Sequence, residues 1–127
     1  KFGLEDNVQF LGELAEKQII EELQKSDIYV STSAAEGLAN SALEAASCGL
    51  PIVAFKCEGM DELIDENRSG FIVDYGDLNL FVDRLAFLIN SKSMRIQFGL
   101  VAREKIENEF DSEVWVDRMI ESYRYMI

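Results

Sequence analysis

The stretch SAAEGLANSALEAASCGLPIVAF, residues 33–55, decides the fold class. It begins at the end of an apolar run, passes through a loop that contains Gly37, continues as a helix and ends in PIVAF, residues 51–55. An apolar run without polar alternation is typical of a strand that is buried on both faces of a parallel sheet. Gly49 and Pro51 follow the last periodic residue of the helix, as is common at helix ends. The stretch therefore predicts a βαβ unit.

The same alternation extends on both sides of this unit. Apolar runs rich in β-branched residues predict further strands at residues 8–11, 28–31 and 71–73. Segments with helical periodicity lie at about 15–25, 39–48 and 60–64, and from residue 78 the pattern is wholly helical, with helices through LFVDRLAFLI, at about 94–110, and from 113 to the end. We therefore expect an α/β fold in a single domain, residues 1–127, with a partial Rossmann-like parallel sheet of about four strands, flanking helices and an all-helical C-terminal segment, residues 78–127.

Composition and charge exclude several classes of function. The chain has 127 residues, of which 48% are hydrophobic, and this fits one domain with a buried core. Its net charge of −12 argues against binding to a nucleic-acid backbone or an anionic membrane surface, and the first 80 residues hold five basic and sixteen acidic side chains. There is no histidine, so a mechanism that needs an imidazole within this chain is excluded.

The two cysteines, Cys48 and Cys57, do not have metal-site spacing, and they indicate buried or reduced thiols in a cytoplasmic protein. The longest apolar run, LPIVAF, is too short to span a bilayer. A peripheral association of the intact protein with the inner membrane stays open. The chain starts at Lys1, which suggests a piece of a longer protein.

The helix at 39–48 presents two different faces. Its apolar face consists of Ala39, Ala42, Leu43 and Ala46. At about 100° per residue, Glu44 lies roughly 140° to 150° from the centre of that face, and Asn40 lies one turn earlier on the same side. A carboxylate there could accept two hydroxyls of a sugar or ribose, although a solvated helix face is the simpler interpretation.

The N-terminus of this helix is a candidate phosphate site. Ligands of open α/β sheets bind at the carboxyl ends of strands, where a helix N-terminus offers N–H groups and a partial positive charge. Gly37 permits close approach of the backbone, and Ala39 and Ser41 are small. A hydrolytic pair of Glu36 and Glu44 is disfavoured, because eight helical residues separate their backbones by about 12 Å and glycoside hydrolases place their carboxyl groups ~5–9.5 Å apart.

These residues resemble a known family. The segment EGLANSALE, residues 36–44, followed by AASCGLPIVAF and later DELIDENRSGFIV, is similar to the E-x7-E signature and downstream strands of the retaining glycosyltransferases of family 4, also called group 1 glycosyl transferases, which have the GT-B fold. The likeness runs from about Val8 to the C-terminus. It implies that the chain is the C-terminal, donor-binding half of such an enzyme.

The resemblance also implies roles for individual residues. Glu36, as the catalytic glutamate, would contact hydroxyls of the donor sugar, Glu44 would hold the ribose hydroxyls, and Leu43 would lie near the nucleoside. The backbone amides that would face the sugar and the diphosphate are those of Gly37, Leu38, Ala39 and Asn40. The family usually needs no metal and no cofactor beyond the nucleotide sugar, with a UDP-sugar as the commonest donor. Its members serve polysaccharide biosynthesis, among other pathways.

Family members also have parts that this sequence does not contain. They have an N-terminal domain for the acceptor and two further βα units, which supply an Arg and a Lys to the diphosphate. Between residues 26 and 55 there is no Lys or Arg, and Lys56 is the nearest candidate. We therefore expect the chain alone to be inactive and to depend on a missing N-terminal domain.

The sequence leaves alternative functions open. A non-catalytic nucleotide-binding or interaction domain could keep the same motif. A receiver-like signalling domain is disfavoured because the strands at 28–31 and 51–55 do not lead into a phosphoacceptor Asp. A nucleotide-sugar epimerase is disfavoured because it needs charged and imidazole groups that are not here. If strands are missing between residues 8–11 and 28–31, residues 28–31 form an exposed edge of the sheet, which can pair with a second copy of the chain. We expect self-association and a monomeric state about equally.

Overall fold

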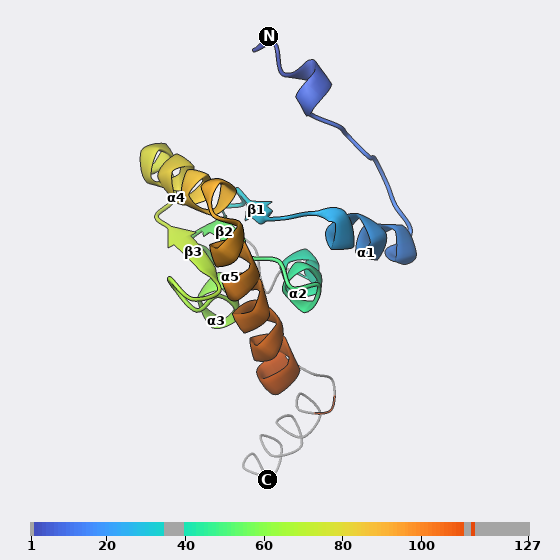
Figure 1. Ribbon diagram of the computed structural model, residues 1–127, viewed down its shortest axis with the longest axis vertical. Coiled ribbons are helices and arrows are strands. Elements are labelled where there is room, and N and C mark those ends of the chain that lie inside the picture. Colours follow the sequence, from blue (N-terminus) through green and yellow to red (C-terminus); the bar gives the residue numbers. More distant parts are fainter. Residues whose placement is uncertain (1, 35–39, 111–112, 114–127) are drawn as a thin grey trace.

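The computed structural model describes residues 2–34, 40–110 and 113 (Figure 1). Its centre is a parallel sheet in the order β1-β2-β3. The strands are β1 (Tyr29–Ser31), β2 (Ile52–Phe55) and β3 (Gly70–Val73). In the register of the sheet, Ile52 lies beside Tyr29 on one side and Gly70 on the other. The α/β class and the strands predicted at 28–31, 51–55 and 71–73 are confirmed.

Helices connect and cover these strands. They are η1 (Glu5–Asn7), α1 (Glu16–Lys25), α2 (Asn40–Ser47), α3 (Met60–Leu63), α4 (Leu78–Asn90), α5 (Lys92–Lys105) and the π-helical turn η2 (Ile106–Phe110). The predicted helix at 94–110 begins two residues earlier, because the Ser91 side chain caps it by accepting a hydrogen bond from the Met94 amide. The helix predicted from residue 113 lies outside the described residues, apart from Glu113. In the described part of the chain, no helix is long and apolar enough to cross a membrane.

The strand predicted at residues 8–11 is wrong, and the described sheet has three strands instead of about four. Residues 8–11 belong to an arm that extends away from the sheet before α1, and the Phe10 side chain is 94% exposed (Figure 1). The sequence there has strand propensity, but a strand is stable only when its backbone groups pair with a neighbour. No described strand lies beside the arm.

The outer edge of β1 is open in the described part of the chain. β1 pairs only with β2 there, and Val30 is 42% exposed. An open edge with an apolar residue can recruit another strand. The sequence favours neither self-association nor a monomer, and light scattering at several concentrations would distinguish the two.

The two faces of β2 separate two hydrophobic clusters. Ile52 and Ala54 point to one face, and Val53 and Phe55 point to the other. The first cluster, called the alanine cluster below, contains Ala42, Ala46, Ile52, Ala54, Cys57, Met60, Leu63, Ile64 and Ala102. The second, the aromatic cluster, contains Val53, Phe55, Phe71, Val73, Phe81, Leu88 and Phe98. α2 and α3 belong to the first face and α4 to the second.

Helix α5 contributes to both clusters and crosses close to the turn that leads into β2. Its residue Phe98 lies in the aromatic cluster and Ala102 in the alanine cluster. Between them, Gly99 lies against Gly49, so closely that a Cβ at Gly99 would be 2.0 Å from the Gly49 carbonyl oxygen. Gly49 itself has a φ of 77°, which glycine adopts at little cost. This contact fixes the C-terminal end of α2 relative to α5.

Candidate functional site

The helix α2 carries the candidate residues that the structure describes. Its residues Ala42, Ala45 and Ala46 are fully buried against the rest of the domain. Because the chain returns from the end of β1 to the start of β2 through α2, the first turn of α2 belongs to the carboxyl edge of the sheet. Open α/β sheets bind their ligands at that edge.

The side of α2 opposite its buried alanines holds the polar candidates. Asn40 is exposed and Glu44 is half-buried, as expected from their angle to the apolar face. Leu43 is half-buried and packs against the alanine cluster. Ala45 is also fully buried, although the sequence pattern did not place it on the apolar face. The buried face is therefore broader than the predicted stripe.

Four predicted site residues lie outside the described part of the chain. They are Glu36, Gly37, Leu38 and Ala39, which belong to the segment between β1 and α2. The roles predicted for them, and for Asn40, Leu43 and Glu44, stay predictions. What the structure does place is the first turn of α2, where backbone N–H groups have no partner within the helix.

A hydroxyl pair connects β1 to this first turn. The Tyr29 Oη lies 2.7 Å from the Ser41 Oγ, and either atom can be the donor. Tyr29 is half-buried, with its body against the alanine cluster, and Ser41 is exposed. From the sequence, Ser41 is predicted only to leave space for a ligand as a small residue. Periodicity does not reveal a contact between a strand and a helix twelve residues apart in the chain. A hydroxyl residue at a helix start, shortly after a strand that contains a tyrosine, is the sequence feature that could have indicated this contact.

The Cys48 thiol, directly after α2, lies near charges of both signs. Burial raises the pKa of the Cys48 thiol, the Glu44 carboxylate raises it further, and the Arg103 guanidinium opposes them. Lys56, the cation suggested by the sequence, is exposed directly after β2, and its backbone amide donates to the Val73 carbonyl at 2.7 Å. Within the described ranges, the Lys56 side chain makes no hydrogen bond or ion pair with α2.

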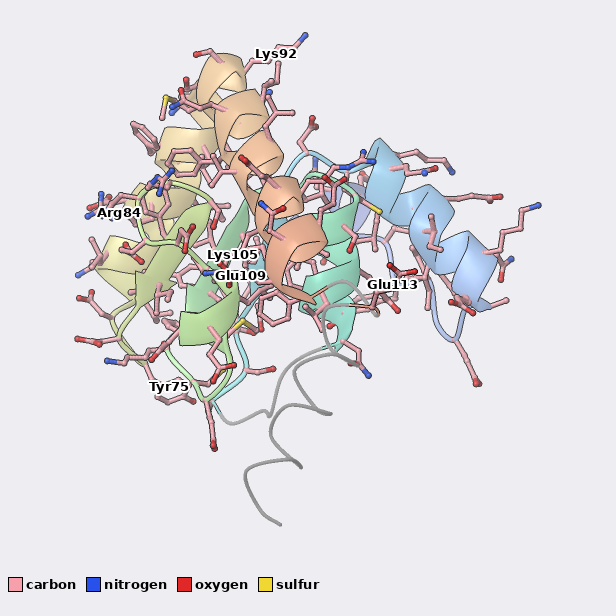
Figure 2. The ribbon with its side chains drawn as sticks, turned by 90° about the horizontal axis from the view of Figure 1, so that it is seen from below. Tyr75, Arg84, Lys92, Lys105, Glu109 and Glu113 are labelled. Carbon is pink, nitrogen blue, oxygen red and sulfur yellow. The ribbon has the colours of Figure 1, made fainter. Side chains whose placement is uncertain are left out.

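A second polar group of residues lies elsewhere and has a structural explanation. A cavity of about 170 Å³ is lined by Asp65, Arg68, Val101, Glu104, Lys105, Asn108 and Glu109. Lys105 donates to the Asp65 Oδ1 at 2.6 Å, and the Glu109 carboxylate is 3.9 Å from the same ammonium group. Figure 2 shows Lys105 and Glu109 close together near the end of α5. The ion pair ties α5 to the turn before β3, so this group holds the fold together.

Comparison with known proteins agrees with this architecture. Residues 1–105 match the family described as "Glycosyl transferases group 1". The amylovoran biosynthesis glycosyltransferase AmsK of Erwinia amylovora is 32% identical over 117 residues, which cover 87% of this chain and 29% of AmsK. Among the curated relatives with the strongest matches, the chain spans only 23% to 29% of their length.

Solved structures share the fold. A structure of Staphylococcus aureus TarM with UDP superposes with a TM-score of 0.85 at 28% identity, covering 93% of this chain and 24% of TarM. Anabaena HepE in complex with UDP-glucose superposes with a TM-score of 0.83 at 27% identity, covering 98% of this chain and 34% of HepE. The three described strands and their helices thus correspond to a part of the GT-B glycosyltransferase fold, as predicted. The chain belongs to the group 1 glycosyl transferases.

Proposed function

We propose that the chain is the donor-binding part of a retaining glycosyltransferase of family 4, which transfers a sugar from a nucleotide sugar to an acceptor in the cytoplasm. The observation that carries the proposal is the division of α2 into two sides. Its alanines are fully buried, whereas Asn40 is exposed and Glu44 is half-buried on the opposite side. This division leaves a carboxylate one turn away from a helix N-terminus at the carboxyl edge of the sheet.

The chemistry of these groups suits a nucleoside diphosphate. The Glu44 carboxylate can only accept hydrogen bonds, and two neighbouring ribose hydroxyls are donors that match its two oxygens. The N–H groups and partial positive charge of the first turn of α2 favour the diphosphate. Glu36, in the preceding segment, would contact the hydroxyls of the sugar. The ribose, the diphosphate and the sugar would then each meet protein atoms of complementary polarity.

The relatives support a uridine nucleotide as the donor. TarM has been solved with UDP, and HepE with UDP-glucose. We propose a UDP-sugar as substrate, with no metal or other cofactor. In the proposed retaining transfer, the departing diphosphate helps to remove the proton of the acceptor hydroxyl, and no side chain of this chain acts as a nucleophile. The acceptor would bind to a further N-terminal domain, so the chain alone would not catalyse transfer.

Titration with UDP, followed by amide chemical shifts, tests the donor site. We expect weak binding, with a dissociation constant of about 1 mM or above, because a helix terminus contributes only about 0.3–1 kcal/mol and the acidic chain repels the ligand. The shifts should concentrate in the first turns of α2. Binding in the micromolar range, or shifts elsewhere in the domain, would contradict the proposal.

The variant Glu44→Gln tests the carboxylate itself. We expect it to weaken UDP binding by about tenfold, because it removes a charged acceptor of two hydrogen bonds. Glu62→Gln on α3 is the control, because it makes the same change at an exposed glutamate in the short helix after β2. Equal, small effects of both variants would indicate that Glu44 is part of a solvated helix face.

In an intact enzyme the two glutamates should differ. Glu36→Ala should mainly lower kcat, because Glu36 would contact the sugar whose reacting carbon moves in the transition state. Glu44→Ala should mainly raise the KM for the donor, because the ribose is remote from that carbon. Steady-state kinetics with varied donor concentration separate the two effects.

A further inference from the structure

We infer that the Ser41 hydroxyl donates a hydrogen bond to a phosphate oxygen of the nucleotide and that Tyr29 is the positioning residue that orients it. The inference rests on the proposed function, because it assigns a further contact to the same donor site. It also adds a residue of β1 to a site that the sequence motif places only on α2 and the segment before it.

The position of Ser41 suits a phosphate contact. It is the second residue of α2, and its side chain is exposed. A hydroxyl in the first turn lies beside the first N–H groups of the helix, which have no partner within the helix itself. A phosphate that accepts bonds from those N–H groups is therefore within reach of the Ser41 side chain.

The Tyr29 hydroxyl restricts what Ser41 can do. Its Oη lies 2.7 Å from the Ser41 Oγ, and the tyrosine body is held against the alanine cluster. Each hydroxyl has one proton to donate. If Tyr29 donates to Ser41, the Ser41 proton is left for a third group. A phosphate oxygen can only accept, so an incoming anion selects this direction, and the two bonds in series strengthen each other.

Ser41 and Glu44 also lie in the order that the ligand requires. Three residues separate them, so they are about 60° apart around the helix and about 4.5 Å apart along its axis. Ser41 lies at the N-terminal end and Glu44 one turn further on the same side of α2. A nucleoside diphosphate lying along this side would place its phosphate at Ser41 and its ribose hydroxyls at Glu44, which are adjacent parts of the molecule.

The test compares UDP with uridine, which has no phosphate, on the chain and its variants. We expect Ser41→Ala to weaken UDP binding about tenfold, because it removes a hydrogen bond to a charged phosphate. Tyr29→Phe should weaken it about threefold, because the Ser41 hydroxyl is then no longer oriented by Tyr29. Uridine binding, measured from the initial slopes of the same amide shifts, should not change. A displacement of α2 would weaken the binding of UDP and of uridine equally. The ratio of the two dissociation constants therefore separates a phosphate contact from a merely structural role.

Two controls complete the experiment. Ser47→Ala removes another α2 hydroxyl, which donates to the Leu43 carbonyl at 2.8 Å at the far end of the helix, and it should leave UDP binding unchanged. Adding Tyr29→Phe to Ser41→Ala should have no further effect, because Tyr29 acts through Ser41. If the unsubstituted chain binds UDP and Ser41→Ala binds it equally well, this inference is overturned and the donor site stands. If the unsubstituted chain binds no UDP, the proposed function fails, and this inference fails with it.

Discussion

The alanine cluster and the aromatic cluster share one strand but are built in different ways. On the α2 face, small residues such as Ala42, Ala46 and Ala54 allow the helix and the sheet to approach closely. On the α4 face, large rings fill the space, and the Phe71 ring contacts those of Phe87 and Phe98 at centroid distances of 5.8 and 5.4 Å. The comparison indicates that the α2 face holds a helix whose polar side lies at the edge of the sheet. The α4 face instead contributes large buried apolar side chains.

The largest effect is expected from Phe71→Ala in the aromatic cluster. Phe71 is 3% exposed, and its removal should lower the free energy of unfolding by about 3–5 kcal/mol, as for other buried phenylalanines. Chemical denaturation measures this change. Phe87→Ala is the control. Because Phe87 is 45% exposed, its removal should lower the free energy of unfolding clearly less. Equal losses from the two variants would show that the buried position of Phe71 is not what stabilises this face.

A smaller effect is expected from Gly99→Ala, where α5 passes between the two clusters. Helix propensity alone would make this change stabilising by about 1 kcal/mol. The new Cβ would meet the Gly49 carbonyl oxygen at 2.0 Å, and both groups belong to backbone that cannot easily move. We expect a net destabilisation of about 1–3 kcal/mol, measured by denaturation. Leu100→Ala, next to it and 65% exposed, should have little effect, and a stabilised Gly99→Ala would refute the close contact.

The smallest effect concerns the Cys48 thiol on the alanine side. Burial and the Glu44 carboxylate raise the pKa of this thiol, so at a given pH a smaller fraction is thiolate than in a free cysteine. The rate of alkylation by iodoacetamide should therefore reach half its maximum at a higher pH than for a small thiol peptide. Glu44→Gln should shift the profile back toward lower pH. A profile at or below that of the peptide would contradict the assigned surroundings of Cys48, while Cys57 is buried and should react slowly throughout.

Much of the fold follows from local patterns in the sequence. The three observed strands are short apolar runs, and such runs identify buried strands of a parallel sheet without knowledge of their partners. The strand predicted at residues 8–11 is wrong because the apolar pattern is a local property of the sequence, whereas the stability of a strand depends on pairing with a neighbouring strand. The predicted start of α5 is two residues too late, because the Ser91 cap, rather than the apolar period, determines where that helix begins.

The candidate site was predictable only in part. The 100° rotation per residue was enough to separate Asn40 and Glu44 from the buried side of α2. It could not identify the pairing of Tyr29 with Ser41, because that contact depends on how a strand and a helix meet in space. Family resemblance added roles for residues such as Glu36, which rotation angles alone cannot assign.

The central place of β2 has a consequence for folding. All four of its residues are buried, and it is hydrogen-bonded to β1 on one side and to β3 on the other. Its partners lie about twenty residues away along the chain in each direction, so neither pairing can form as a local hairpin. Two long loops must close before the backbone groups of β2 are hydrogen-bonded on both sides. Helices that form from local contacts, such as α4 and α5, are therefore expected to form before the sheet. The amide protons of β2 should then be among the last to exchange with solvent, because they open only when both crossovers come apart.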